Sequence, residues 1–178
     1  MKRKIQIWDY AGEIMSSLQK GVLLTTKSGK QVNTMTISWG MMGIEWAKPI
    51  FTVFIRENRF TRTLLEQNPE FTVNIPYGEF DKKILGICGT KTGRDADKIN
   101  LAGLTLETPE NVSVPAIREL PLTLECRVIY KQKQNPQAIT DEKNQKFYPQ
   151  NVDSSYHSAN KDYHTAYYGE IVAAYIIE

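Results

Sequence analysis

Two short segments of the chain carry the residues that could bind a small ligand. The first covers residues 33–40 (NTMTISWG), and its side chains alternate between two faces when it is extended. One face would carry a row of hydroxyl groups, from Thr34, Thr36 and Ser38. The opposite face would carry an amide and an apolar wall, from Asn33, Met35, Ile37 and Trp39. Hydroxyl groups can bind phosphate oxygens, and an apolar wall with an indole suits a flat ring.

The second segment covers residues 56–62 (RENRFTR) and brings three arginines to the start of a predicted helix. These are Arg56, Arg59 and Arg62, and Thr61 stands where it would cap the helix. A helix N-terminus presents free N–H groups and the positive end of its dipole, and guanidinium groups bind phosphate oxygens in pairs. The two segments together indicate a ligand with a phosphate at one end and a flat ring at the other. Flavin mononucleotide (FMN) has this shape.

Each of these residues also has a purely structural interpretation. An arginine is often a solvated surface charge, and a row of threonines can be the solvent face of an edge strand, because threonine favours strands. Trp39 would serve equally well in core packing, and Asn33 would suit a turn after Lys30. The sequence leaves these alternatives open for each residue taken singly.

Length and composition limit the architecture and the partners. The 178 residues, 41% of them hydrophobic, suffice for one well-packed core and predict a single domain over residues 1–178. The net charge of +2 comes from 22 basic and 20 acidic residues, with no basic tract. We therefore expect neither nucleic acid nor a membrane surface as a partner.

The first residues and the cysteines bear on the compartment. Residues 1–4 (MKRK) resemble the basic start of a signal peptide, but Trp8, Asp9 and Tyr10 follow in place of an apolar run. Cys88 and Cys126 lie far apart without Cys-x-x-Cys spacing, and we expect both to be buried as small apolar side chains. These features predict a soluble, cytoplasmic protein.

The hydrophobic pattern is mostly that of short strands. We predict strands at residues 21–26, 33–39, 50–55, 71–75, 104–106, 122–130 and 167–177. Short helices are predicted at residues 61–67, at residues 80–87 and at the end of the polar loop 89–98. The turn residues 27–30 (KSGK) predict a hairpin between the first two strands. Many strands at short spacing indicate a mainly β fold, an antiparallel barrel with a few short helices.

A polar stretch from residue 131 to residue 165 separates the last two strands. Although its composition is typical of a flexible insertion, we expect it to be ordered by packing on a partner subunit. It contains both histidines of the chain, His157 and His164, and neither has the ligand spacing of a metal site. No bound metal is therefore expected.

Five short motifs, in this order, resemble the flavin reductase-like family, which includes the flavoredoxins. They are residues 33–40, 56–61 (RENRFT), 71–76 (FTVNIP), 89–98 (GTKTGRDADK) and 169–172 (GEIV). The resemblance spans residues 21–177. It implies an FMN-binding split β-barrel with Greek-key-like connections, usually a homodimer with the flavin near the subunit interface.

The family pattern also extends the expected cofactor contacts to Phe60 and Lys98. In this pattern the lysine reaches the flavin, and an ammonium group near N1 and O2 of the ring would stabilise the reduced, anionic cofactor. A surface ion pair of Lys98 with Asp95 or Asp97 is the structural alternative. Family members often bring a late histidine or aromatic residue to the site, which makes His157 or His164, and Tyr167 and Tyr168, secondary candidates.

The resemblance implies an NAD(P)H-dependent flavin reductase. FMN would take a hydride at N5 from NADH or NADPH, and the protein would hold the two rings face to face. The sequence has no Gly-x-Gly-x-x-Gly fingerprint, so the nicotinamide would stack on the flavin itself.

Two other functions fit the same residues. A flavoredoxin-like electron carrier would bind FMN tightly and exchange electrons with a redox protein partner. A split-barrel binding module would hold another flat ligand, such as haem or pyridoxal phosphate. The colour of the purified protein and its reaction with NADH or NADPH separate the three.

Overall fold

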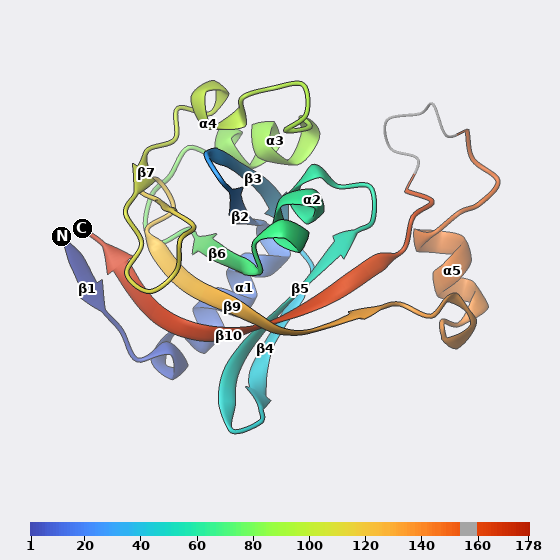
Figure 1. Cartoon of the computed structure of the whole chain (residues 1–178), viewed down its shortest axis with the longest axis horizontal. Coiled ribbons are helices and arrows are strands. Elements are labelled where there is room, and N and C mark those ends of the chain that lie inside the picture. Colours follow the sequence, from blue (N-terminus) through green and yellow to red (C-terminus); the bar gives the residue numbers. More distant parts are fainter. Residues whose placement is uncertain (154–159) are drawn as a thin grey trace.

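One antiparallel sheet dominates the computed structural model, which describes residues 1–153 and 160–178. Its strands lie in the order β3-β2-β6-β9-β10-β5-β4, and β1 pairs with the end of β10 (Figure 1). Their bounds are β1 Lys2–Lys4, β2 Val22–Ser28, β3 Gln31–Ile37, β4 Gly40–Glu45, β5 Lys48–Arg56, β6 Glu70–Ile75, β9 Leu122–Lys133 and β10 His164–Ile177. The two-stranded sheet of β7 (Leu106–Glu107) and β8 (Ala116–Ile117) is separate. The mainly β, antiparallel prediction is confirmed.

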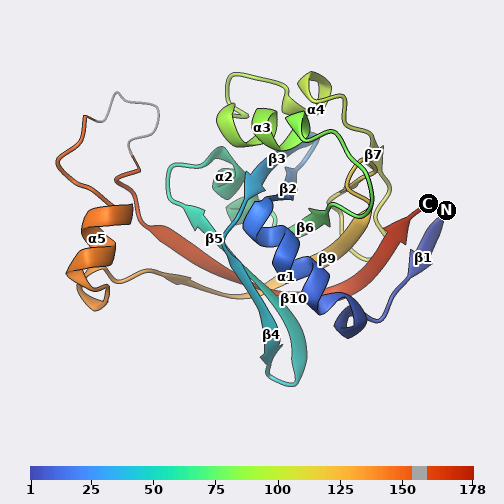
Figure 2. The same cartoon turned by 180° about the vertical axis from the view of Figure 1, so that it is seen from behind.

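The helices are short and lie around this sheet. They are α1 Ala11–Lys20, α2 Phe60–Gln67, α3 Lys83–Thr90, α4 Lys98–Leu101 and α5 Asp141–Phe147, with 3-10 turns at Ile7–Tyr10 and Pro136–Ala138. Figure 1 shows α2, α3 and α4 on one side of the curved sheet, and Figure 2 shows α1 crossing the sheet beside β4. No helix in the described ranges is long and apolar enough to cross a membrane.

The inner faces of the strands form the main core. Leu24, Phe51, Val73 and Leu124 are completely buried there, and they come from four different strands. Six of the seven predicted strands are present, the prediction at 104–106 overlaps β7 only at Leu106, and β2 and β3 pair as the predicted hairpin. Cys88 and Cys126 are buried free thiols, as expected. Alternation of apolar residues was therefore a sufficient signal for the central strands.

The sequence analysis missed α1, α5 and β4. Strand β4 pairs with β5 through a tight turn in which Trp46 and Ala47 both have positive φ, of 51° and 57°. Two-residue hairpin turns of this kind usually contain asparagine, aspartate or glycine. Because neither residue signals a turn, the hairpin could not be recognised from the local sequence.

The polar stretch between β9 and β10 forms an arm that carries α5 (Figure 1). His157 lies outside the described residues. The described part of the arm is attached to the body by Arg56 at the end of β5, which donates hydrogen bonds to backbone carbonyls of the arm. Contacts within the same chain therefore hold the described part of the arm, and its packing on a partner subunit stays a prediction.

Candidate functional site

A cavity of about 480 Å³ lies between β3, the start of α2 and the segment that joins α3 to α4. All but one of the predicted cofactor residues line it: Asn33, Met35, Thr36, Ser38, Trp39, Arg56, Arg59, Phe60, Thr61 and Lys98. The lining also includes five cationic side chains and a single carboxylate, that of Asp95. The cavity is therefore suited to an anionic ligand.

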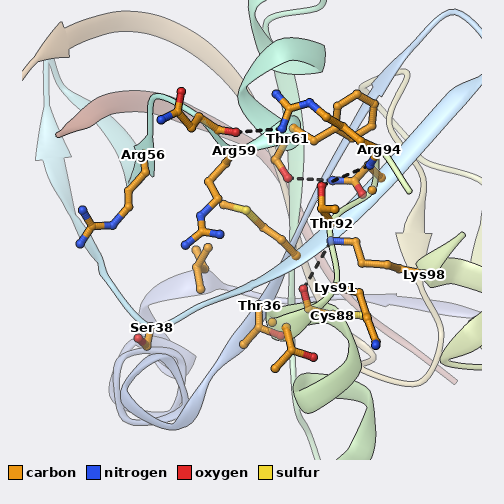
Figure 3. Close-up of a pocket in the computed structure, with 18 of the residues that line it drawn as sticks. Thr36, Ser38, Arg56, Arg59, Thr61, Cys88, Lys91, Thr92, Arg94 and Lys98 are labelled. Atoms are coloured by element: carbon orange, nitrogen blue, oxygen red, sulfur yellow. Dashed lines mark hydrogen bonds between the residues drawn. The ribbon is translucent and has the colours of Figure 1, made fainter. Parts of the chain in front are cut away.

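Lys98 places a buried ammonium group in the wall of this cavity. Lys98 is only 4% exposed, and its Nζ donates one long hydrogen bond, of 3.4 Å, to the Cys88 carbonyl (Figure 3). Burial lowers the pKa of Lys98 to about 8. Asp97 does not pair with it, because its carboxylate caps α4 by accepting from Asn100. No ion pair of Lys98 occurs among the described residues, so an anionic ligand could supply the missing partner.

The start of α2 adds a second group of donors at the same end. Arg59 is the N-cap residue, with extended backbone, and its side chain makes no capping hydrogen bond. The first N–H groups of α2 are thus left for a ligand. Figure 3 shows Arg59 reaching toward Thr36 and Ser38 across the cavity.

The prediction that Thr61 caps α2 is wrong. Thr61 lies inside the first turn of the helix, and its hydroxyl accepts a 2.7 Å hydrogen bond from Nδ2 of Asn33. This bond joins β3 to α2 and orients the Asn33 amide. Thr61 therefore holds the two motifs together at the cavity wall.

Arg56 reaches the cavity, but its guanidinium group is already occupied. Nη1 donates to the carbonyls of Asn160 and Asp162 at 3.0 and 2.6 Å, and Nη2 donates to that of Phe147 at 3.0 Å. The group also lies over the Tyr148 ring. Arg62, the third arginine, lies outside the cavity and pairs with Glu66. Of the three predicted phosphate-binding arginines, Arg59 has the fewest side-chain contacts among the described residues, a single hydrogen bond of 3.2 Å from Nη2 to Oδ1 of Asn160.

The predicted row of hydroxyl groups is interrupted. Thr34 is completely buried outside the cavity, where its hydroxyl bonds to that of Thr25 and to the Leu24 carbonyl. The Thr36 hydroxyl lines the cavity but donates to the Leu85 carbonyl at 2.7 Å. The elements that cover β3 therefore consume these hydroxyl groups, which the strand alone would have left exposed.

An aromatic wall closes the other end of the cavity. Trp39 is 40% exposed and contacts His164 and Phe147, with ring centroids 5.0 and 5.3 Å away. His164 is buried, and its Nδ1 lies 2.9 Å from the Tyr148 hydroxyl. Burial and the nearby Arg56 lower the pKa of His164 to about 4, so the imidazole is neutral near pH 7. Neither of the late tyrosine candidates lines the cavity: Tyr167 is buried against Glu66, and Tyr168 packs against Tyr130.

The loop before α4 contributes residues that the sequence analysis noted only as a motif. A Cβ atom on Gly93 would lie 2.0 Å from Oδ1 of Asn33 and 2.8 Å from the Phe60 ring, so only glycine fits there. Arg94 donates to the Asn58 carbonyl and lies over Phe60. The glycine in the motif was the available signal for this close approach.

Comparison with known proteins decides the family. The model of the flavin reductase like domain matches residues 15–178. The chain belongs to this family. As a family member, it resembles the flavoredoxin of Methanosarcina acetivorans with a TM-score of 0.65 and 25% identity, over 89% of this chain and 68% of that one. A Shewanella frigidimarina protein with a split barrel domain matches at a TM-score of 0.65 and 17% identity, over 98% and 76%. The split-barrel fold expected from the sequence is confirmed.

A curated relative is more similar in sequence over a shorter stretch. It is an uncharacterized protein of Archaeoglobus fulgidus, 33% identical over 97 residues. The match covers 54% of this flavin reductase-like chain and 54% of the relative. The chain therefore aligns with little more than half the length of the curated relatives it matches.

Proposed function

We propose that this flavin reductase-like chain binds FMN in the cavity at β3 and α2, and acts as an NAD(P)H-dependent flavin reductase. The observation that carries the proposal is the buried Lys98 ammonium group, which has one long hydrogen bond and no carboxylate partner. Near it, α2 begins without a side-chain cap, and an aromatic wall closes the opposite end. The residues present thus fit a ligand with an anionic end and a flat ring.

The residues would divide the ligand between them by chemistry. The first N–H groups of α2 suit the phosphate because the Arg59 side chain does not cap the helix. The Arg59 guanidinium group adds positive charge there, although its Nη2 already donates to Oδ1 of Asn160 at 3.2 Å. Trp39 offers an exposed aromatic face to the ring. The Asn33 amide, oriented by Thr61, can donate to and accept from a polar ring edge. Lys98 would compensate negative charge that develops on the ring during reduction.

FMN, when bound, would supply the hydride acceptor for reduced nicotinamide. The chain itself needs to exclude water and hold the rings in contact. Neutral His164 and Trp39 form the wall on which such contact would occur, and His164 adds no charge there. No acid, base or nucleophile of the protein is required for this transfer.

We also propose that the chain forms a homodimer. Exposed apolar residues gather on two projecting ribbons: Met41, Ile44 and Trp46 on the β4–β5 hairpin, and Ile129 and Tyr130 on β9. The Trp46 ring lies at the edge of Tyr130, with centroids 6.1 Å apart, which joins the two groups into one surface. A contiguous exposed apolar surface of this kind is typical of a protein interface.

The test is an absorption spectrum of the purified protein with added FMN, followed by anaerobic NADH and then NADPH. Saturable binding with rapid bleaching by one nicotinamide would support the reductase and identify its donor. Binding with bleaching only by dithionite would replace the reductase with an electron carrier that serves a protein partner. Failure to bind FMN would overturn the proposal.

A further inference from the structure

A second cavity, of about 630 Å³, lies on the other side of Trp39 from the first. It opens between α1 and the beginning of β4, which lie beside each other in Figure 2. The residues that line it are Met15, Ser16, Leu18, Gln19, Ser38, Trp39, Gly40, Phe54 and Gln134. Ser38, Trp39 and Phe54 line both cavities, so the two spaces share one wall.

The chemistry of the second cavity differs from that of the first. Met15, Leu18, Trp39 and Phe54 form apolar walls, and none of the described residues that line it is ionisable. The first cavity carries five cationic side chains. A ligand bearing phosphate or carboxylate would lose its hydration in the second cavity without finding a counter-charge. An uncharged compound with a flat ring would instead bury apolar surface against Trp39.

Gln134 provides the polar contact in this cavity. Its Oε1 accepts hydrogen bonds from the Tyr148 hydroxyl, at 2.8 Å, and from the His164 backbone N–H, at 3.1 Å. Because both partners are donors, the amide atom that faces them is the oxygen, and the nitrogen Nε2 points the other way. Within the described part of the chain, no hydrogen bond engages Nε2. Gln134 therefore keeps two N–H donors at a fixed position, and a carbonyl oxygen is their natural acceptor.

We propose that the second cavity binds an uncharged cyclic conjugated carbonyl compound of the quinone class. Its ring would pack on Trp39 and its carbonyl oxygen would accept from Nε2 of Gln134. The exposed apolar residues assigned above to a dimer interface lie on the β4–β5 hairpin and β9, and none of them lines this cavity. The proposal goes beyond FMN binding, since it depends on the second cavity alone.

The test is calorimetric titration of the full chain with duroquinone, an uncharged tetramethyl quinone, with and without FMN. We expect saturable binding at one site. Gln134→Glu keeps the oxygen that accepts from Tyr148 and His164 but replaces the donor with a carboxylate oxygen. It should weaken quinone binding by about tenfold or more, because one hydrogen bond is lost and the new carboxylate oxygen repels the carbonyl oxygen of the quinone.

Met15→Trp fills the cavity and should abolish quinone binding while FMN affinity stays unchanged. Glu13→Gln, an exposed α1 position that does not line the cavity, is the matched control and should bind quinone normally. Absence of saturable duroquinone binding would overturn the proposal, as would binding that neither Gln134→Glu nor Met15→Trp alters. Slower hydrogen exchange in α1 of the dimer than in α1 of the monomeric Ile44→Glu variant would also overturn it, because a second copy would then cover the cavity. Quinone binding without FMN binding would support this site and contradict the proposed reductase.

Discussion

Lys98 illustrates how much the function of a residue depends on its burial. A buried ammonium group with one weak acceptor destabilises the flavin-free protein, because it has lost its hydration without gaining a counter-charge. An anionic ligand would remove that penalty. A buried, unpaired ammonium group is therefore easily explained at a site that binds an anion. Two predictions test whether Lys98 binds FMN in this way.

The first prediction concerns the replacement Lys98→Met, which keeps the side-chain length and removes the charge. We expect weaker FMN binding, by about tenfold, because one charge-assisted contact is lost. The flavin-free variant should melt at a higher temperature than the parent, since the buried charge is gone. Thermal unfolding and FMN titration measure both, with Lys30→Met, at an exposed turn position, as the control. Lower stability together with unchanged affinity would contradict a ligand-binding role.

The second prediction concerns pH. The pKa of Lys98 is lowered to about 8, so the ammonium form declines above that pH and FMN affinity should fall with it. Stability should change in the opposite direction. The unfolded chain holds its proton to a higher pH than the folded chain, so Lys98 contributes rising stability between about pH 8 and its unfolded pKa near 10.4. FMN titrations from about pH 6 to about pH 9 should show an FMN affinity that declines as the pH rises, and this decline should be absent in Lys98→Met.

The third prediction concerns His164 in acid. Burial and Arg56 lower the pKa of its imidazole to about 4, whereas the unfolded value is near 6.5. The unfolded chain therefore binds the proton first, and the protein should lose stability as the pH falls from about 6.5 to about 4. His164→Asn should show a smaller loss over this range in chemical denaturation. An equal loss in the variant would remove His164 as the cause.

At the scale of elements, Arg56 connects β5 to the arm between β9 and β10. Its three hydrogen bonds reach the end of α5 and the residues just before β10. Through them the arm supplies Phe147 and Tyr148, which pack against Trp39 and His164. The element that closes the aromatic end of the cavity is thus attached by a residue first expected to bind phosphate.

The fourth prediction contrasts two neighbouring arginines. Arg56→Ala should accelerate hydrogen exchange in α5, because the arm loses the donors that attach it. Arg59→Ala removes one bond to the arm, to Oδ1 of Asn160, where Arg56→Ala removes three, so α5 should stay more protected in Arg59→Ala. FMN binding should weaken by about tenfold, because the Arg59 guanidinium group in the cavity is lost. Hydrogen exchange and FMN titration on the pair separate anchoring from ligand binding. Equal effects of both variants on α5 and on affinity would refute this division of roles.

For the whole molecule, the sheet leaves two ribbons extending from its body. Figure 1 shows the β4–β5 hairpin projecting in one direction, and the C-terminal end of β9 with the N-terminal end of β10 projecting in another. Both carry exposed apolar side chains, including Ile44 at 73% exposure. Such residues are costly in water unless they meet another surface.

The fifth prediction tests this surface. Ile44→Glu should convert a dimer to a monomer without lowering the melting temperature of the protein, because Ile44 is not part of the hydrophobic core. Sedimentation velocity provides the measurement. Leu106→Glu, on β7 and 41% exposed, introduces the same charge elsewhere and should leave the dimer intact. A parent chain that sediments as a monomer would remove the proposed interface.

The sequence was enough to predict the central strands, the β2–β3 hairpin and most of the residues that meet in one cavity. The period of a strand predicts which side chains lie on the same face of the sheet, and short motifs predict which side chains lie near the start of a helix. Both are local properties of the sequence. Hence Asn33, Trp39 and Arg59 were predicted from local patterns, whereas Lys98 was predicted from the resemblance to the family, and all four line the cavity. The β4–β5 hairpin was not, because its turn uses Trp46 and Ala47 at positive φ.

The folded structure was needed to show which of these residues remain free for a ligand. Arg56 is bound by carbonyls of a segment about a hundred residues further along the chain, and the Thr34 hydroxyl by a neighbouring strand. Lys98 became a buried cation because other segments cover it, and the second cavity exists because α1 packs beside β4. Hydrogen-bond partners and burial are set by contacts between distant segments, so they follow from the packed fold and not from any local pattern.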